Sequence, residues 1–201
     1  VTADLLVKNV HHTDLIIIPA LDGNMVDNLR QNQEFIPWIV KQYAGGSELA
    51  SLCVGAFMLA STGLISGRKC ATHWMAANDF RKMFPDVDLV EDKVITDENG
   101  IYSSGGAFSY LNLILYLIEK YAGREIAIFC SKAFQIEFRR DSQSPFIVFQ
   151  GQKDHEDEPI RKAQEFIEKN FHQKITVDQL GNMFALGRRN LARRFKKARS
   201  E

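Results

Sequence analysis

Residues 49–56 read LASLCVGA, and this stretch decides the fold. LASLC (49–53) is a short apolar run of the kind that forms a buried parallel strand. Gly55 allows a tight turn into a helix that runs to about Thr62. A buried strand that ends in Cys53 and turns sharply into a helix has the geometry of a nucleophile elbow. Backbone N–H groups and the helix N-terminus would then favour the anionic form of the thiol.

A histidine follows the elbow at a distance of twenty residues. His73 lies in ATHW (71–74), just before a predicted helix. A Cys and a His on neighbouring loops at one edge of a sheet can form a nucleophile–base pair, so Cys53 and His73 are the candidate catalytic residues. The structural alternative stays open, because free cysteines are often buried and a His beside Trp74 can simply cap a helix or fill a gap.

Strand-like and helix-like segments alternate on both sides of the elbow. The predicted strands are 15–19 (LIIIP), 49–53, 87–90, 93–96 and 101–104, and the predicted helices are 27–43 (with Pro37 as a point of division), 55–62, 72–83, 107–121 and 124–134. Strands that alternate with helices predict an α/β layer fold with a mostly parallel sheet. Ser103-Ser104-Gly105-Gly106 leads into one of these helices and is either an anion site at its N-terminus or a plain turn.

The cysteine count and the composition exclude several classes of protein. The three cysteines form no CxxC or Cys/His pattern, which indicates a reduced, cytoplasmic chain without a metal site. Cys70 follows Arg68 and Lys69, which would lower its pKa slightly, and we interpret Cys70 and Cys130 as packing residues. No cofactor motif, membrane span or signal peptide is identified. The 45% hydrophobic content supports a real core in a chain of 201 residues.

The net charge of zero hides an asymmetry. Residues 1–150 contain 13 Lys and Arg against 17 Asp and Glu, a net charge of −4, whereas residues 151–201 contain 12 against 8, a net charge of +4. We therefore predict a first domain over 1–150, a polar linker over 151–158 and a small domain over 159–201. An acidic domain joined to a basic one suits a sensor fused to a nucleic-acid reader.

The second segment is predicted to be all helix. Pro159–Asn170 has helical apolar spacing, and Thr176 with Gln179 forms a capping box at the start of the next helix. After the connector 185–187, residues 188–199 read RRNLARRFKKAR, with apolar residues on one face and cations on another. Two short helices joined by a tight turn, the second cationic, match a helix-turn-helix. The predicted DNA-binding residues are Arg188, Arg189, Asn190, Ala192, Arg193, Arg194, Lys196 and Lys197.

Together these stretches resemble a known family. LCVGAFMLASTGLISGRKCATHW, the later SSGG and RRDSQSPF, and ITVDQLGNMFALGRRNLARRFKKA are similar to AraC-type transcriptional regulators with an N-terminal ThiJ/PfpI domain, of the GlxA type. The resemblance covers about residues 10–199. It implies a flavodoxin-like sheet with helices on both faces, with Cys53 at the elbow and His73 at the histidine position. It also implies contacts from Arg189, Ala192 and Arg193 to bases, and from Arg188, Arg194, Lys196 and Lys197 to phosphates.

The chain also departs from the family pattern. Such regulators begin with a further strand and helix and end with a second helix-turn-helix, so we expect a chain truncated at both ends. Val54 stands where isonitrile-hydrating relatives have a hydroxyl residue, Asn112 where Asp is frequent, and Gly187 where Ser usually caps the reading helix. These departures weaken an enzymatic interpretation more than a regulatory one.

The main hypothesis from the sequence is a DNA-binding transcriptional regulator whose first domain binds an unknown small-molecule effector and forms a homodimer. The alternative hypothesis is a cysteine-dependent enzyme of the same superfamily that acts on a small carbonyl, amide or isonitrile compound. A variant of the first makes Cys53 an oxidation sensor.

Overall fold

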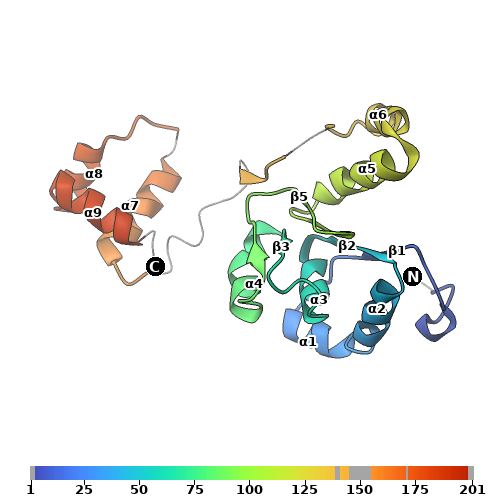
Figure 1. Cartoon of the computed structure of the whole chain (residues 1–201). Coiled ribbons are helices and arrows are strands. Elements are labelled where there is room, and N and C mark those ends of the chain that lie inside the picture. The colour runs from blue at the N-terminus through green and yellow to red at the C-terminus, as the bar shows by residue number, and fades with distance from the viewer. Residues whose placement is uncertain (1–2, 139–140, 145–154, 171, 199–201) are drawn as a thin grey trace. The chain divides into compact units, whose positions relative to one another are not determined.

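The computed structural model describes residues 3–138, 141–144, 155–170 and 172–198. The chain divides into two compact units, Val1–Ile147 and Val148–Glu201, which run from blue to yellow and from orange to red in Figure 1. The predicted domain end at 150 and the first half of the predicted linker, 151–154, lie outside the described residues.

The first unit is built on a four-stranded sheet with the order β1-β2-β6-β5. The strands β1 (Leu15–Ile18), β2 (Glu48–Leu52) and β6 (Ile101–Ser104) are parallel, and β5 (Ile95–Asp97) is an antiparallel edge strand. A small parallel pair joins β3 (Lys69–Cys70) to β4 (Asp88–Leu89). The mostly parallel sheet confirms the prediction, although the short strand β3 was not foreseen.

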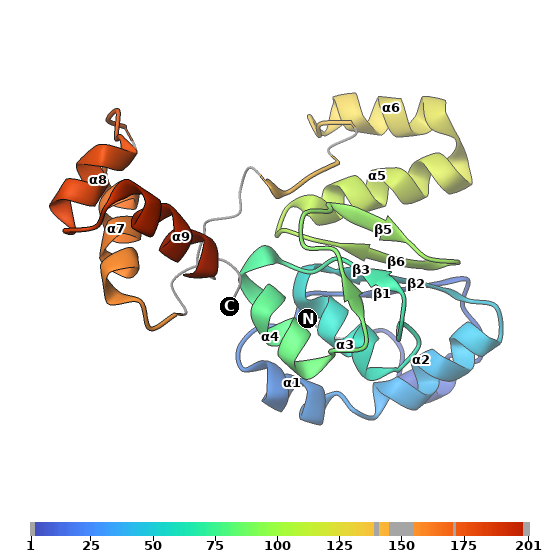
Figure 2. The ribbon, with the colours of Figure 1, turned by 60° about the vertical axis from the view of Figure 1, so that its left-hand side comes forward.

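Helices cover both faces of this sheet, which explains why its central strands β2 and β6 are largely buried. Figures 1 and 2 show α1 (Met25–Gln31), α2 (Phe35–Ala44), α3 (Ala56–Ser61) and α4 (Ala77–Met83) on one face, α5 (Ser109–Ala122) on the other and α6 (Arg124–Ala133) outside α5. Alternate residues of the strands serve the two cores: Leu49 and Ile101 face the four-helix side, and Ala50 and Tyr102 face α5. This arrangement confirms the predicted flavodoxin-like α/β fold.

One predicted helix proves to be two. The stretch 27–43 is divided between α1 and α2, and the division precedes Pro37, which lies in the first turn of α2. A proline is tolerated there because N–H groups of the first turn have no partner inside the helix. Helix α1 has its own start, where the Asn24 side chain accepts a hydrogen bond from the Asp27 N–H group. Similarly, the predicted helix 72–83 begins as a 3-10 turn, Trp74–Ala76, before α4.

The described residues of the second unit, 155–170 and 172–198, form three helices that pack together. Its helices are α7 (Glu158–Lys169), α8 (Val177–Met183) and α9 (Arg188–Ala198), and they pack around Ile160, Leu180 and Leu191. The capping box predicted at Thr176 is present, with both reciprocal hydrogen bonds to Gln179. The small all-helical segment therefore agrees with the helix-turn-helix expected from the sequence.

None of the described helices combines the length and the apolar content needed to cross a bilayer. Likewise, the described residues contain no group of three or more His, Cys, Asp or Glu side chains placed to hold a metal ion.

Candidate functional site

The Cys53 elbow is a strained turn. Cys53 directly follows β2 and has a φ of 55°, a backbone conformation that is uncommon for residues other than glycine. Two residues later, a Cβ atom on Gly55 would lie 2.5 Å from the Pro19 carbonyl oxygen and 2.7 Å from the Ile18 carbonyl oxygen. The glycine therefore lets α3 begin hard against the end of β1. This is the sharp strand-to-helix turn that LASLCVGA predicts.

The protonation of Cys53 differs from the expectation. The side chain is half-buried, and this burial raises the pKa of the thiol above its ordinary value. The hydrogen bond from the Val54 backbone pulls the pKa in the opposite direction, with the smaller effect. Burial thus outweighs the backbone donors at this turn, so the neutral thiol is favoured instead of the anticipated thiolate.

His73 is engaged by its own helix. Its Nδ1 atom accepts a hydrogen bond from the Met75 N–H group at 3.2 Å, which caps the turn Trp74–Ala76, and its ring centroid lies 5.6 Å from that of Trp74. Partial burial lowers the pKa of the imidazole. The described contacts include no hydrogen bond between Cys53 and His73. Instead, the Thr72 hydroxyl donates to the Cys53 carbonyl oxygen at 3.2 Å, so the two loops meet without pairing these side chains.

The candidate anion site at the turn Ser103-Ser104-Gly105-Gly106 is occupied by a side chain of the same unit. The Gly106 N–H group, which could bind an anion, donates to the Gln143 side-chain oxygen at 3.0 Å. Ser109, in the first turn of α5, has a buried hydroxyl with no partner among the described residues. The sequence had not singled out Gln143, because a polar side chain in a charged stretch gives no sign that it will be buried.

Helix α9 presents the predicted cationic surface. Leu191 and Ala198 are buried in the second unit, at 2% and 6% exposure, and they hold the opposite face outward. The exposed residues are Arg188, Arg189, Asn190, Ala192, Arg193, Lys196 and Lys197. Arg193 donates to the Asn190 side-chain oxygen at 3.1 Å, which orients both side chains along the helix. All eight predicted DNA-binding residues thus lie on α9, and seven of them are exposed.

Arg194 differs from the other seven. Its Nε and terminal nitrogen atoms donate to the two carboxylate oxygens of Asp157, at 2.7 and 2.5 Å. Only 28% of the Arg194 side chain and 24% of the Asp157 side chain are exposed. This two-point pair joins α9 to the start of α7 and engages two of the guanidinium nitrogens that the expected phosphate contact would use.

Asp157 also corrects the expectation of a solvated linker up to Glu158. Its carboxylate accepts a hydrogen bond from the Ile160 N–H group and caps α7, which begins at Glu158. The neighbouring His155 is buried, and its ring contacts the Gln164 side chain at 3.2 Å. Residues 155–158 therefore belong to the helical unit, because capping and the arginine pair hold them there.

A family comparison explains the elbow and the sheet around it. Residues 1–120 match the model of the DJ-1/PfpI family, and this range contains both Cys53 and His73. The chain belongs to the DJ-1/PfpI family.

Two transcriptional regulators are similar to this DJ-1/PfpI chain, and one of the two matches nearly its whole length. GbdR of Pseudomonas aeruginosa, an HTH-type transcriptional regulator, is 27% identical, and the match covers 98% of this chain and 53% of GbdR. ArgR of the same organism, also an HTH-type transcriptional regulator, is 28% identical over 78% of this chain and 48% of ArgR. The chain thus spans about half the length of these relatives. An AraC family transcriptional regulator from Pseudomonas putida shares the fold, with a TM-score of 0.57, 18% identity and coverage of 67% of this chain and 70% of that one.

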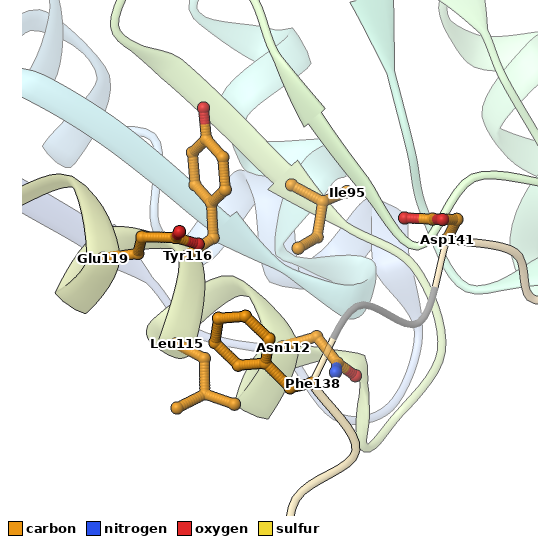
Figure 3. Close-up of a pocket in the computed structure, with 7 residues that line it drawn as sticks. All are labelled: Ile95, Asn112, Leu115, Tyr116, Glu119, Phe138 and Asp141. Atoms are coloured by element: carbon orange, nitrogen blue, oxygen red, sulfur yellow. The ribbon is translucent and has the colours of Figure 1, made fainter. Parts of the chain in front are cut away.

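The first unit, Val1–Ile147, contains the residues of the family match and is named the DJ-1/PfpI unit. It also contains a cavity away from the elbow. A hollow of about 320 Å³ lies between α5, β5 and the segment that follows α6 (Figure 3). Leu115 and Ile95 give it an apolar wall, and Glu119 and Asp141 place carboxylates at its edge. The described residues that line it are Ile95, Asn112, Leu115, Tyr116, Glu119, Phe138 and Asp141. The size and the mixed lining fit a small organic ligand with polar groups.

The two remaining cysteines of the DJ-1/PfpI unit differ from each other. Cys70 is buried, and burial raises its pKa to about 12, in contrast to the slight lowering expected from Arg68 and Lys69. Cys130 is only half-buried, because the inner face of α6 is formed by Ala127 and Ser131. Cys70 is therefore a packing residue, whereas Cys130 remains partly accessible.

Proposed function

We propose that this chain is part of a DNA-binding transcriptional regulator in which the helical unit reads DNA and the DJ-1/PfpI unit receives a small-molecule signal. The exposed cationic face of α9, held outward by Leu191 and Ala198, carries the proposal. A cationic helix of this kind fits the major groove and neutralises phosphates. GbdR, an HTH-type transcriptional regulator whose match covers 98% of this chain and therefore both units, supports the same function.

Different residues of α9 are assigned different roles. Arg189, Ala192 and Arg193 share one exposed face and are proposed to contact base edges. Arg188, Asn190, Lys196 and Lys197 flank that face and are proposed to contact the backbone of the DNA. Arginine suits the first role because its planar guanidinium can bind guanine through two hydrogen bonds.

The test is a binding titration of the complete protein on a fragment of its own promoter, followed by fluorescence anisotropy. Specific binding should weaken steeply between about 50 and 200 mM salt, because each neutralised phosphate releases counterions. Arg193→Ala should weaken specific binding by about 1–3 kcal/mol and relax the sequence preference. Lys169→Ala, an exposed cation at the end of α7, is the matched control and should have little effect. A binding affinity that depends on neither the salt concentration nor the DNA sequence would refute the proposal.

The signal is proposed to enter through the cavity in Figure 3. A thermal-shift screen of small polar metabolites would compare the wild type with Leu115→Trp, in which the larger ring fills the cavity. Compounds bound there should stabilise the wild type and lose that effect in the variant. Compounds that stabilise both proteins equally would place the sensing site elsewhere.

We also propose that the DJ-1/PfpI unit forms a homodimer through the outer face of α6. Ile126 and Phe129 on this helix are 50% and 70% exposed, and Phe134 directly after it is 72% exposed. Several exposed large apolar side chains on and just after one helix are typical of a surface that a second copy covers. Light scattering should give a dimer for the complete protein, and Phe129→Asp should shift it toward the monomer.

A cysteine-dependent enzyme and an oxidation sensor both require a reactive thiolate at Cys53. The raised pKa of Cys53 and the engagement of His73 with Met75 count against both. The regulator is therefore proposed alone.

A further inference from the structure

An exposed carboxylate lies against the start of the cationic helix α9. The Asp178 side chain, in the first turn of α8, pairs with the guanidinium of Arg188 at 3.6 Å, and Arg188 is the first residue of α9. In a helix-turn-helix, the N-terminal residues of the second helix contact base edges while the first helix crosses the DNA backbone. Asp178 therefore brings a negative charge to the border of the surface that is proposed to meet DNA.

The turn between the two helices fixes the position of Asp178 relative to Arg188. The Leu186 N–H group donates to the Gly181 carbonyl oxygen at 2.8 Å, and a Cβ atom on Gly181 would lie 2.6 Å from the Leu186 carbonyl oxygen and 3.9 Å from the Arg188 backbone nitrogen. Asp178 precedes Gly181 by three residues, so the two share one side of α8. The capping box described above holds the turn of α8 that contains Asp178. The carboxylate therefore stays within reach of the Arg188 guanidinium.

Two aspartates pair with arginines of α9, and the two pairs differ in strength. Asp157 binds Arg194 through two contacts of 2.7 and 2.5 Å, with 24% and 28% of the side chains exposed. Asp178 and Arg188 make one contact at 3.6 Å, with 66% and 73% of the side chains exposed. An exposed pair of this kind contributes little to the stability of a fold. Arg188 can therefore exchange Asp178 for a DNA phosphate at little cost to the helical unit.

We propose that Asp178 is a specificity-determining residue that competes with the DNA backbone for Arg188. Binding to random DNA depends on phosphate contacts, so a carboxylate that retains Arg188 and repels phosphates weakens it. At the operator, contacts to base edges add affinity and hold the protein in one register, in which other N–H groups of the Arg188 guanidinium can meet a phosphate while one stays with Asp178. The carboxylate thus penalises the wrong DNA more than the right one. This inference rests on the proposed function.

Asp178 also has a structural interpretation. A carboxylate in the first turn of a helix interacts favourably with the N-terminal end of the helix dipole. A residue with this role alone would change the thermal stability of the second unit when it is replaced, and would leave the sequence preference and the salt dependence of DNA binding as in the wild type. These two properties of DNA binding therefore separate the two roles.

The first test compares the wild type with Asp178→Asn in the complete protein, by fluorescence anisotropy on promoter DNA and on random DNA of the same length. The affinity for random DNA should rise several-fold in Asp178→Asn, whereas the affinity for the promoter should change little. The slope of log affinity against log salt on random DNA should steepen by about 0.9, because the freed Arg188 neutralises one more phosphate. Asp178→Glu keeps the charge and should behave as the wild type. An unchanged preference and slope in Asp178→Asn would overturn the proposal.

Two further variants test whether Asp178 acts through Arg188. Glu165→Gln removes the same charge from an exposed position of α7 and should leave the preference and the slope at their wild-type values. In an Arg188→Gln background, Asp178→Asn should no longer steepen the salt dependence, because the cation that it frees is absent. An equal steepening in that background, or in Glu165→Gln, would indicate general charge repulsion and refute the competition for Arg188.

The same titrations distinguish a failure of this inference from a failure of the proposed function. A wild type that binds promoter and random DNA with equal affinity would refute the regulator, and this inference with it. A wild type that prefers its promoter, together with an Asp178→Asn variant of the same preference, would refute the role of Asp178 alone.

Discussion

At the scale of single residues, Cys53 combines the backbone turn of a nucleophile elbow with a thiol that is favoured in its neutral form. The turn at φ 55° lifts the residue out of the strand, while burial raises the thiol pKa. His73 does not lower the pKa of this thiol, because its Nδ1 atom accepts a hydrogen bond from the Met75 N–H group instead. The reactivity of Cys53 is therefore set by its burial and not by a neighbouring base.

We accordingly predict that the pH midpoint for alkylation of Cys53 lies above the free-cysteine value of about 8.5. His73→Ala should leave this midpoint in place, since no hydrogen bond joins the two residues among the described contacts. Mass spectrometry of the intact protein over a pH series gives the midpoint. Cys70, with a pKa raised to about 12 by burial, is an internal control that should stay unmodified in the folded protein. A midpoint below 8.5 that rises in His73→Ala would restore the Cys–His pair.

How far the sequence predicts a residue's role depends on whether that role is local. The elbow at Cys53 follows from its neighbours, because strand, glycine and helix start are adjacent in the chain. The roles of Gln143 and Arg194 depend on partners such as Thr72, 71 residues from Gln143, and Asp157, 37 residues from Arg194. No pattern in one sequence indicates which distant carboxylate will form an ion pair with an arginine of a cationic helix.

At the scale of elements, the pair of Asp157 with Arg194 joins the start of α7 to α9. Asp157→Ala removes both the helix cap and the ion pair, whereas Asp157→Asn keeps an oxygen for the cap and removes only the charge. We predict that the free energy of unfolding of the second unit falls in the order wild type, Asp157→Asn, Asp157→Ala, with about 1 kcal/mol attributable to the cap. Thermal unfolding followed by helical circular dichroism checks this order, and equal stability of the three proteins would contradict it.

The same pair has a defined pH dependence. The Arg194 guanidinium holds the pKa of Asp157 below its ordinary value, so the folded state binds the proton less readily than the unfolded state. The advantage of the wild type over Asp157→Asn should therefore be complete above the ordinary aspartate pKa of about 3.9 and should vanish as the pH falls through the lower folded value. Denaturant titrations at pH 7 and at acidic pH measure the difference. An advantage that grows on acidification would reverse this assignment.

The sequence predicts a helix or strand well where the residues that determine it are consecutive in the chain. The capping box at Thr176 and the buried strand that leads to Cys53 are written in consecutive residues, and both appear in the structure. The division between α1 and α2 was predicted at Pro37, whereas α1 ends at Gln31 with Asn32 as its C-cap and α2 begins at Phe35. Pro37 lies in the first turn of α2, where a proline does not interrupt a helix. The strand β3 has only two residues and exists because β4 lies beside it, so local propensity could not indicate it.

At the scale of the whole molecule, the division into two compact units predicts that damage stays local. Gly55→Ala forces a Cβ atom against two backbone carbonyl groups that cannot move aside, and should destabilise the first unit by about 1–3 kcal/mol. Hydrogen exchange should speed up in the strands of the first unit while α7 and α9 keep their wild-type protection. Asp157→Ala serves as the mirror control, with faster exchange in the helices alone. Equal loss of protection in both units by either variant would show one cooperative structure.

The left-handed backbone of Cys53 has a consequence for protein engineering. An L residue with a side chain is disfavoured in this conformation by roughly 1–2 kcal/mol, whereas glycine adopts it freely. We therefore expect Cys53→Gly to be more stable than Cys53→Ala in thermal unfolding, the reverse of the usual order for a helix start. A directed-evolution campaign that rewards heat resistance alone would be drawn toward glycine at this position, and would erase the thiol in the process. Thermal stability therefore favours glycine at position 53, whereas any role of the thiol requires cysteine there.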